Sequence, residues 1–337
     1  MNTNKLNKVI EEKEFSGVVY IEKEGKVIFE EAYGYADRSN LIPNKINTSF
    51  GIASGCKLFT AIAILQLIEK GSLSLDTYLK DCLKIDFPKF DPSIKIRHLL
   101  NHSSGVPDYF DEEVMDDFSV LWENTPMYMI RELKDFLPMF KDGKMDFEPG
   151  KKFKYNNAGF ILLGLIVEEV SGISFREYVK VNIFDRYGMD DSGYFALDKL
   201  PANTAYGYEQ DESGEWKSNI YSVPVIGGAD GVAFTTASDL SRLWKGLQDN
   251  KILSKETIED MLSPQIQVDD DCYYGHGIWL IKNSDKVSQY YIVGEDPGVT
   301  MISSVFPQEK IKLTILANTE YGTWEISGVI EEMLKLS

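Results

Sequence analysis

The chain has 337 residues, and 53 Asp and Glu residues against 35 Lys and Arg residues give it a formal net charge of −18 at pH 7. This balance argues against nucleic acid and against an anionic membrane surface as partners, because binding to either needs a basic stripe. The length allows one large domain, or two closely packed ones, with an ample hydrophobic core.

The N-terminus and the cysteines indicate the compartment. Residues 1–8 (MNTNKLNK) contain no apolar stretch of the kind found in secretory signals, and no run of the sequence approaches the roughly 20 apolar residues that cross a bilayer. Cys56, Cys82 and Cys272 are odd in number and widely spaced, which suits a reducing compartment. We therefore expect a cytoplasmic protein without a membrane partner.

The first elements in the chain are a short helix and a hairpin. Residues 3–13 have the spacing of an amphipathic helix. Strands are predicted over 16–23 and 26–35, joined across Glu24 and Gly25, a pair typical of a tight hairpin turn.

A serine and a lysine three positions apart, Ser54 and Lys57, stand at the start of an apolar helix predicted over 57–70. Residues i and i+3 share a helix face, so the Lys57 amine can reach the Ser54 hydroxyl. The partial positive charge of a helix N-terminus stabilises an oxyanion and helps keep the amine uncharged, so that it can act as a base. In the alternative interpretation the pattern arises by chance and Lys57 extends to water. Cys56 lies on another face of the helix and is expected to be an inert thiol.

Residues from 57 to about 220 are expected to be mainly helical, with further helices over 126–138, 158–171 and 174–186. Tyr155 and Asn157 precede one of these helices and point the same way if their segment is extended. A phenol near an ammonium can lose its proton more readily and pass it to a leaving group, while an asparagine amide can bind a substrate carbonyl. Alternatively, both residues only cap the following helix.

The close histidine pair His98 and His102 is spaced i, i+4, but Leu99 stands where a zinc-protease helix has its glutamate, and no third ligand is apparent. We expect these histidines to hydrogen-bond a loop. The sequence has no glycine-rich phosphate loop and no dinucleotide fingerprint. The predicted reaction therefore needs no metal and no cofactor.

The last third of the chain returns to strands after two helices. Helices are predicted over 237–249, where Thr236 and Asp239 suggest a capping box, and over 255–262. Strands over 273–282, 287–294, 299–306 and 310–317 precede a final helix over 322–335. Strands at both ends predict an α+β fold: an antiparallel sheet with flanking helices from residues 1–56 and 225–337, and an inserted, mainly helical lobe from residues 57–224.

Several segments stand in a characteristic order around these motifs: FSGVVY at 15–20 with YGYAD at 33–37, IRHLLNHSSGVPDY at 96–109, GGADGV at 227–232 and TASDL at 236–240. With Ser54–Lys57 they resemble the serine hydrolases related to class C β-lactamases, D-alanyl-D-alanine carboxypeptidases and their esterase relatives. The resemblance implies a single domain with the β-lactamase/transpeptidase-like fold. It also implies Ser54 as the nucleophile of an acyl-enzyme, Lys57 as its base, and Tyr155 with Asn157 as the second motif.

The third motif of that family departs from its pattern here. A basic residue, any residue and a glycine are expected on a strand beside the serine, but the matching segment has Ile292 before Gly294. The glycine permits close approach of the backbone to the substrate, and the N–H of Glu295 can supply an oxyanion donor. His276 can reach the same cleft from a neighbouring strand, although an ordinary strand position is the favoured interpretation.

Without the basic residue, we expect neutral small esters or amides as substrates, with weak or no cleavage of β-lactams and D-Ala-D-Ala peptides. Two alternatives stay open: a catalytically silent ligand-binding or sensing protein, and a true β-lactamase or carboxypeptidase. The acidic stretch 111–117 is either a solvated loop near the cleft mouth or a device that disfavours anionic substrates. The sequence leaves the physiological substrate and the oligomeric state open.

Overall fold

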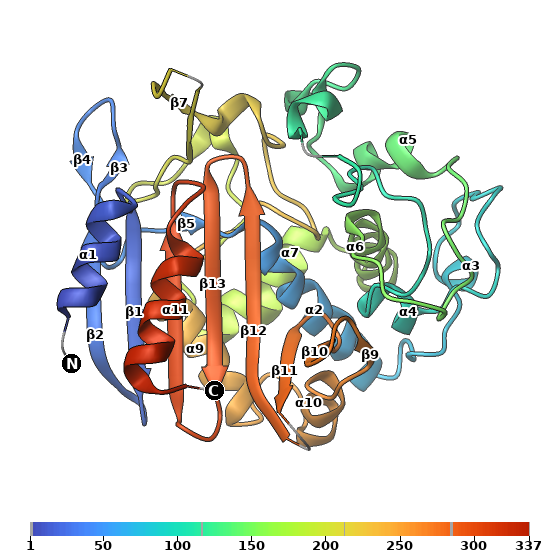
Figure 1. Ribbon diagram of the computed structural model, residues 1–337. Helices are drawn as coiled ribbons and strands as arrows, with labels where there is room; N and C mark the ends of the chain where they lie inside the picture. Colours follow the sequence, from blue (N-terminus) through green and yellow to red (C-terminus); the bar gives the residue numbers. More distant parts are fainter. Residues whose placement is uncertain (1–2, 116, 212, 284–285, 337) are drawn as a thin grey trace.

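The computed structural model describes residues 3–115, 117–211, 213–283 and 286–336. An eight-stranded antiparallel sheet has the order β2-β1-β14-β13-β12-β11-β10-β9 (Figure 1). Its strands are β1 Gly17–Lys23, β2 Lys26–Tyr33, β9 Ile266–Gln267, β10 Cys272–Tyr274, β11 Trp279–Asn283, β12 Lys286–Asp296, β13 Val299–Phe306 and β14 Ile311–Ala317. The first strand of the chain pairs with the last, Gly17 opposite Ala317, which confirms the α+β fold with a sheet formed by both chain ends.

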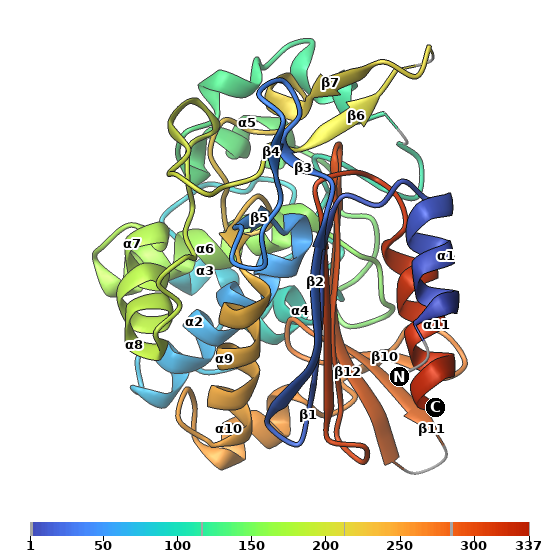
Figure 2. The ribbon, with the colours of Figure 1, turned by 90° about the vertical axis from the view of Figure 1, so that its left-hand side faces the viewer.

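Helices cover both faces of the sheet, as the edge-on view in Figure 2 shows. Helices α1 (Asn4–Glu12) and α11 (Thr323–Leu334) lie together on one face, over the buried side chains of Val19, Ile302 and Ile315. The other face carries the larger core, to which α2 (Lys57–Glu69), α6 (Asn157–Ser171) and α9 (Ala237–Gln248) contribute. The alternation of side chains along each strand divides the apolar residues between these two cores.

The remaining helical segments are short: α3 Leu79–Cys82, α4 Ile96–Leu100, α5 Leu137–Phe140, α7 Phe175–Val179, α8 Asp185–Tyr187 and α10 Lys255–Met261. Lys180–Phe184, a π-helical stretch, joins α7 to α8. Short two-stranded ladders are formed by β3 (Tyr35–Asp37) with β4 (Ile42–Pro43), β5 (Phe50–Gly51) with β8 (Phe234–Thr235), and β6 (Tyr208–Gln210) with β7 (Trp216–Ser218). The segment 57–224 contains most of these helices, and its boundary with the sheet lobe stays a prediction.

The helix predicted over 126–138 is wrong as a single element. The structure has 3₁₀ turns at Met127–Met129 and Leu133–Phe136, followed by α5. The side chain of Asp135 accepts hydrogen bonds from the N–H groups of Arg131 and Glu132 at 3.0 and 2.8 Å, which starts a new turn at that point. Side-chain bonds of this kind compete with helix continuation.

The strand predicted over 273–282 is a hairpin, β10 and β11, with a turn at Gly275–Gly277. A Cβ on Gly277 would lie 2.4 Å from the Cβ of Ala61, so the turn packs directly on α2. The capping box at α9 is half formed. Thr236 accepts a hydrogen bond from the N–H of Asp239, but the Asp239 carboxylate accepts from Ser192 and Asp191 instead.

Within the described residues, no single helix is both long and apolar enough to cross a membrane. One pair, Asn157–Ser171 with Phe175–Tyr187, passes that test together but is bent by 78°.

Candidate active site

Ser54 lies where strand β5 ends and a single 3₁₀ turn, Ala53–Cys56, leads into α2. Ala53 adopts a left-handed backbone conformation, with φ of +43°, which is strained for a residue with a side chain. Among its buried neighbours Gly55, Cys56 and Lys57, Ser54 keeps partial exposure. The turn therefore presents the Ser54 hydroxyl at the surface of a cavity, while the rest of the segment is fixed in the core.

Lys57 is 2% exposed, and its Nζ contacts three oxygens: Ser54 Oγ at 2.9 Å, Asn157 Oδ1 at 2.8 Å and the carbonyl oxygen of Asp230 at 2.7 Å. Two of these partners can only accept hydrogen bonds. As an ammonium, Lys57 Nζ can donate to all three oxygens; as an uncharged amine it would donate its two N–H groups to the amide and carbonyl oxygens, and its lone pair would then face Ser54 Oγ. The interpretation in which Lys57 extends to water does not hold.

Tyr155 lies beside this pair, with its ring centre 4.9 Å from Lys57 Nζ and its plane stacked on Trp279. Burial, reinforced by the charge of Glu112, raises the pKa of Tyr155 well above its usual value, while a hydrogen bond with Ser54 acts in the opposite direction. Burial thus opposes the loss of the phenol proton that was expected from a nearby ammonium. Tyr155 is a neutral phenol, able to donate its proton.

Asn157 is the first residue of α6, and the residue that caps this helix is its neighbour. Asn156 accepts the N–H of Gly159 at 2.6 Å through its side chain, which leaves the Asn157 side chain free for Lys57. The interpretation in which Asn157 only caps the helix is therefore wrong.

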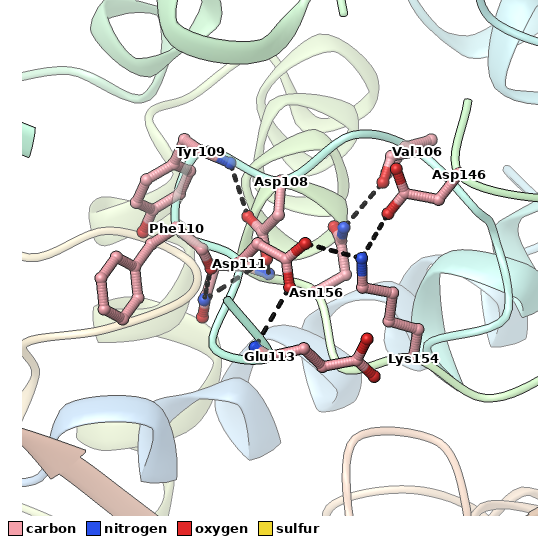
Figure 3. A network of polar contacts seen from close by, with 10 residues as sticks. Val106, Asp108, Tyr109, Phe110, Asp111, Glu113, Asp146, Lys154 and Asn156 are labelled. Carbon is pink, nitrogen blue, oxygen red and sulfur yellow. Dashed lines mark hydrogen bonds and ion pairs between the residues drawn. The ribbon is translucent and has the colours of Figure 1, made fainter. Parts of the chain in front are cut away.

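A loop from residue 102 to 111 holds the Tyr155–Asn157 segment in place (Figure 3). The carboxylate of Asp108 accepts hydrogen bonds from the N–H groups of Asn157 and Ala158 at 2.6 and 3.0 Å. His102 Nδ1 accepts the N–H of Asn156 at 3.1 Å. Burial raises the pKa of Asp108 to about 7 and lowers the pKa of His102 well below its usual value, so the imidazole is uncharged.

Asp111 and Asp146 extend this network by binding the Lys154 ammonium at 2.7 and 2.6 Å, as Figure 3 shows. The carbonyl oxygen of Val106 accepts from the Asn156 amide at 2.8 Å. The segment IRHLLNHSSGVPDY thus has a physical role, which is to fix the start of α6 and with it Asn157.

Strand β12 brings the third motif against the turn that carries Ser54. A Cβ at Gly294 would lie 2.1 Å from the carbonyl oxygen of Ile52 and 2.9 Å from the N of Gly55, so only glycine permits this approach. Ile292 lies on the same side of the strand and is buried. The Glu295 side chain points to the other face of the sheet, where it accepts a hydrogen bond from Trp324 Nε1 at 2.6 Å. Glu295 is nevertheless among the residues that line the cavity above Ser54.

His276 is not part of this site. It lies in the turn between β10 and β11, fully buried, with its Nε2 3.3 Å from Asp260 Oδ2. Both interpretations offered for it, a cleft residue and an ordinary strand residue, are wrong, since the hairpin was not predicted. His98 accepts the N–H of Lys95 at 3.2 Å, so both members of the His98–His102 pair bind a loop. Among the described residues no three His, Cys, Asp or Glu side chains are arranged to hold a metal.

The cavity above Ser54 has a volume of about 730 Å³ and is acidic. Glu112, Asp230 and Asp296 line it, from a loop, the segment before β8 and the end of β12. Burial raises the pKa of Asp230, and burial together with the charges of Asp230 and Glu112 raises the pKa of Asp296 to about 8. The acidic stretch 111–117 contributes Glu112 and Asp117 to the cavity wall.

This fold, with a serine hydroxyl held against a buried lysine amine, defines a serine hydrolase of the β-lactamase type. The chain belongs to the β-lactamase family, since the family model described as Beta-lactamase matches residues 5–330. It is 30% identical over 326 residues to penicillin-binding protein 4* of Bacillus subtilis (strain 168), an alignment that covers 93% of this chain and 70% of that protein.

Solved structures agree with this assignment. The penicillin binding protein from Bacillus halodurans is 49% identical, with a TM-score of 0.94 over 97% of this chain and 99% of its own. The D-amino acid amidase from Ochrobactrum anthropi SV3, at 23% identity and a TM-score of 0.77 over 99% of this chain and 98% of its own, shares the fold. The resemblance stated from the sequence motifs is thereby confirmed.

Proposed function

We propose that the chain hydrolyses small esters or amides through an acyl-enzyme on Ser54. The observation that supports this is the placement of Lys57, whose two fixed acceptors leave its lone pair to take the Ser54 proton. Ser54 Oγ then attacks the substrate carbonyl, and the N–H groups of Ser54 and Glu295 bind the oxyanion. Tyr155 gives its proton to the leaving group, and water then cleaves the acyl-enzyme.

Replacing the nucleophile tests this proposal directly. Ser54→Ala is expected to abolish turnover of a p-nitrophenyl ester and covalent labelling by a fluorophosphonate, because it removes the hydroxyl that contacts the Lys57 amine at 2.9 Å. Ser119→Ala, which removes another serine of the cavity wall, should retain labelling. Equal labelling of the Ser54→Ala variant would refute the assignment, and a stable acyl adduct that never turns over would favour a silent binding protein.

We further propose that Ile292 directs the enzyme away from anionic substrates. A basic side chain at this position would bind a substrate carboxylate, and Ile292 offers only a buried apolar surface. We expect neutral p-nitrophenyl esters to be cleaved by the native chain and a chromogenic cephalosporin or a D-Ala-D-Ala peptide to be cleaved weakly or not at all.

Ile292→His should raise the cephalosporin rate by roughly tenfold or more, the value of a charge-assisted hydrogen bond. Ile292→Leu, which keeps the apolar character, is the matched control and should not raise it. Efficient cephalosporin cleavage by the native chain would contradict this part of the proposal.

A further inference from the structure

The charged side chains that line the cavity are mostly acidic. Besides Glu112, Asp230 and Asp296, the acidic side chains of the wall include Asp117, Glu209 and Glu320, and the cation among its described lining residues is Lys217. Lys217 is already engaged, because its ammonium lies 3.2 Å from Glu209 Oε2. A negatively charged substrate entering this cavity would meet repulsion, whereas a positively charged one would be attracted.

Most of these carboxylates have partners within the protein. Glu320 accepts the N–H of Gly298 at 3.2 Å, Glu112 accepts the side-chain amide of Asn157 at 3.3 Å, and Asp230 accepts the hydroxyl of Tyr109. Asp296 differs from them. Across the described parts of the chain, its carboxylate has no hydrogen bond and no ion pair, although Asp230, Glu112 and Lys57 lie close enough to affect its charge.

Asp296 is also aimed at the reacting groups. It follows Ile292 and Gly294 on alternate positions of β12, so all three point to the side of the strand that faces the Ser54 turn. Its Oδ2 lies 4.0 Å from where a Cβ of Gly231 would stand, next to the carbonyl of Asp230 that binds Lys57. The strand on which the sequence resemblance led us to expect a basic residue therefore brings a carboxyl group to the cavity.

We propose that the cavity selects substrates in which an ammonium group lies close to the scissile carbonyl, and that Asp296 is the specificity-determining residue that receives it. This inference rests on the proposed function of the Ser54 site. The ammonium would give Asp296 the partner it lacks and would favour the ionised carboxylate, so that Asp296 releases the proton that burial holds on it, while Glu112 adds a negative charge nearby.

An isosteric pair of substrates tests the proposal. Alanine p-nitroanilide, as both enantiomers, differs from isobutyric p-nitroanilide by an ammonium in place of a methyl group. We expect kcat/KM for at least one alanine enantiomer to exceed that for the neutral anilide by roughly tenfold or more, with the monoanilide of methylmalonic acid the poorest substrate. In Asp296→Asn the preference for the ammonium should fall to about twofold or less.

Asp91→Asn is the matched control, because it makes the same change outside the cavity, at a turn where Asp91 accepts the N–H of Ser93, and it should retain the preference of the native chain. Equal kcat/KM for the cationic and neutral anilides in the native chain, or an unchanged preference in Asp296→Asn, would overturn the proposal. Thermal melting and fluorophosphonate labelling of Asp296→Asn establish that the variant folds with an intact Ser54.

Binding measured without turnover separates this inference from the proposed function. In calorimetric titrations, benzylammonium should bind the native chain at least about tenfold more tightly than benzyl alcohol, and phenylacetate should bind most weakly. The advantage of benzylammonium should be lost in Asp296→Asn. If neutral esters are turned over but benzylammonium has no advantage, the inference fails alone. If benzylammonium binds through Asp296 but Ser54 is never acylated, the proposed function fails alone.

Discussion

In the proposed mechanism Lys57 acts as a base, and the groups that bind its amine are suited to that role. Asn157 Oδ1 and the carbonyl oxygen of Asp230 are neutral acceptors, so they bind the amine without favouring its charged form as strongly as a carboxylate would. The acid groups of the cavity act in the other direction, since their ionised forms favour an ammonium. The state of Lys57 therefore depends on which of the surrounding oxygens carry charge.

Asn157→Asp tests this dependence. A carboxylate in contact with Lys57 Nζ should favour the ammonium, so kcat/KM at neutral pH should fall by roughly tenfold or more and recover as the pH rises. A pH–rate profile measures the displacement of the rising limb toward higher pH. Asn157→Ala removes the same amide without adding charge, and its activity should fall with no such displacement. Identical profiles for the two variants would contradict this account.

At the scale of elements, the position of α6 decides the position of Asn157. The helix begins at the site because Asp108 and His102, on a separate loop, accept the N–H groups of its first residues and of Asn156. A helix N-terminus has unpaired N–H groups that need such acceptors. The loop therefore stabilises the helix and aligns the second motif with a single set of hydrogen bonds.

Asp108→Asn is expected to disturb that alignment. The amide keeps one acceptor oxygen and turns an N–H₂ group toward backbone donors, so kcat/KM should fall by roughly tenfold to a hundredfold. Asp91→Asn makes the same change at an exposed turn, where Asp91 accepts the N–H of Ser93 at 2.8 Å, and should leave kcat/KM unaltered. Steady-state kinetics on a neutral ester measures both variants, and equal rates for Asp108→Asn and the native chain would refute a positioning role.

Elements with a strong local pattern could be predicted from the sequence, and elements set by distant contacts could not. The apolar helices over 57–70 and 158–171 correspond to α2 and α6. The turn that divides β10 from β11 packs on α2, and nothing near it in the sequence indicates that contact. In the site, Ser54 and Lys57 are neighbours on one turn, whereas Asp108, Asp230 and Asp296 come from three separate loops or strand ends without periodicity.

At the scale of the whole molecule, several carboxyl groups are buried in addition to the acidic residues on the surface. Burial raises the pKa of Asp108 to about 7 and of Asp296 to about 8, and it raises the pKa of Asp230 and Asp239. Each group holds a proton in the folded chain at pH values where the unfolded chain has released it. The histidines act in the opposite sense, because burial lowers the pKa of His98, His102 and His276 and the unfolded chain protonates them below about pH 6.5. Above about pH 7 the carboxyl groups dominate, and the folded state binds more protons than the unfolded state up to about pH 8.

Stability is therefore expected to fall as the pH rises from about 7 to about 8.5. Urea denaturation should give a lower midpoint at about pH 8.5 than at about pH 7, and Asp296→Asn should reduce the difference because its side chain does not ionise. At low pH the trend is reversed, because the pKa of Glu22 is lowered by its bond with Lys312 against the effect of burial, and protonation of Glu22 removes that stabilising contact. A midpoint that rises from about pH 7 to about pH 8.5 would contradict the prediction.

The pairing of β1 with β14 also governs the order in which the molecule can assemble. While the ribosome is still adding residues, β1 can form its hairpin with β2, but its opposite edge stays unpaired until residues 311–317 have emerged. An open strand edge readily pairs with other chains, and contacts between distant residues form slowly. We expect nascent chains of this protein to depend on slow translation, low temperature or chaperones for soluble yield, and chains stopped after β13 to aggregate.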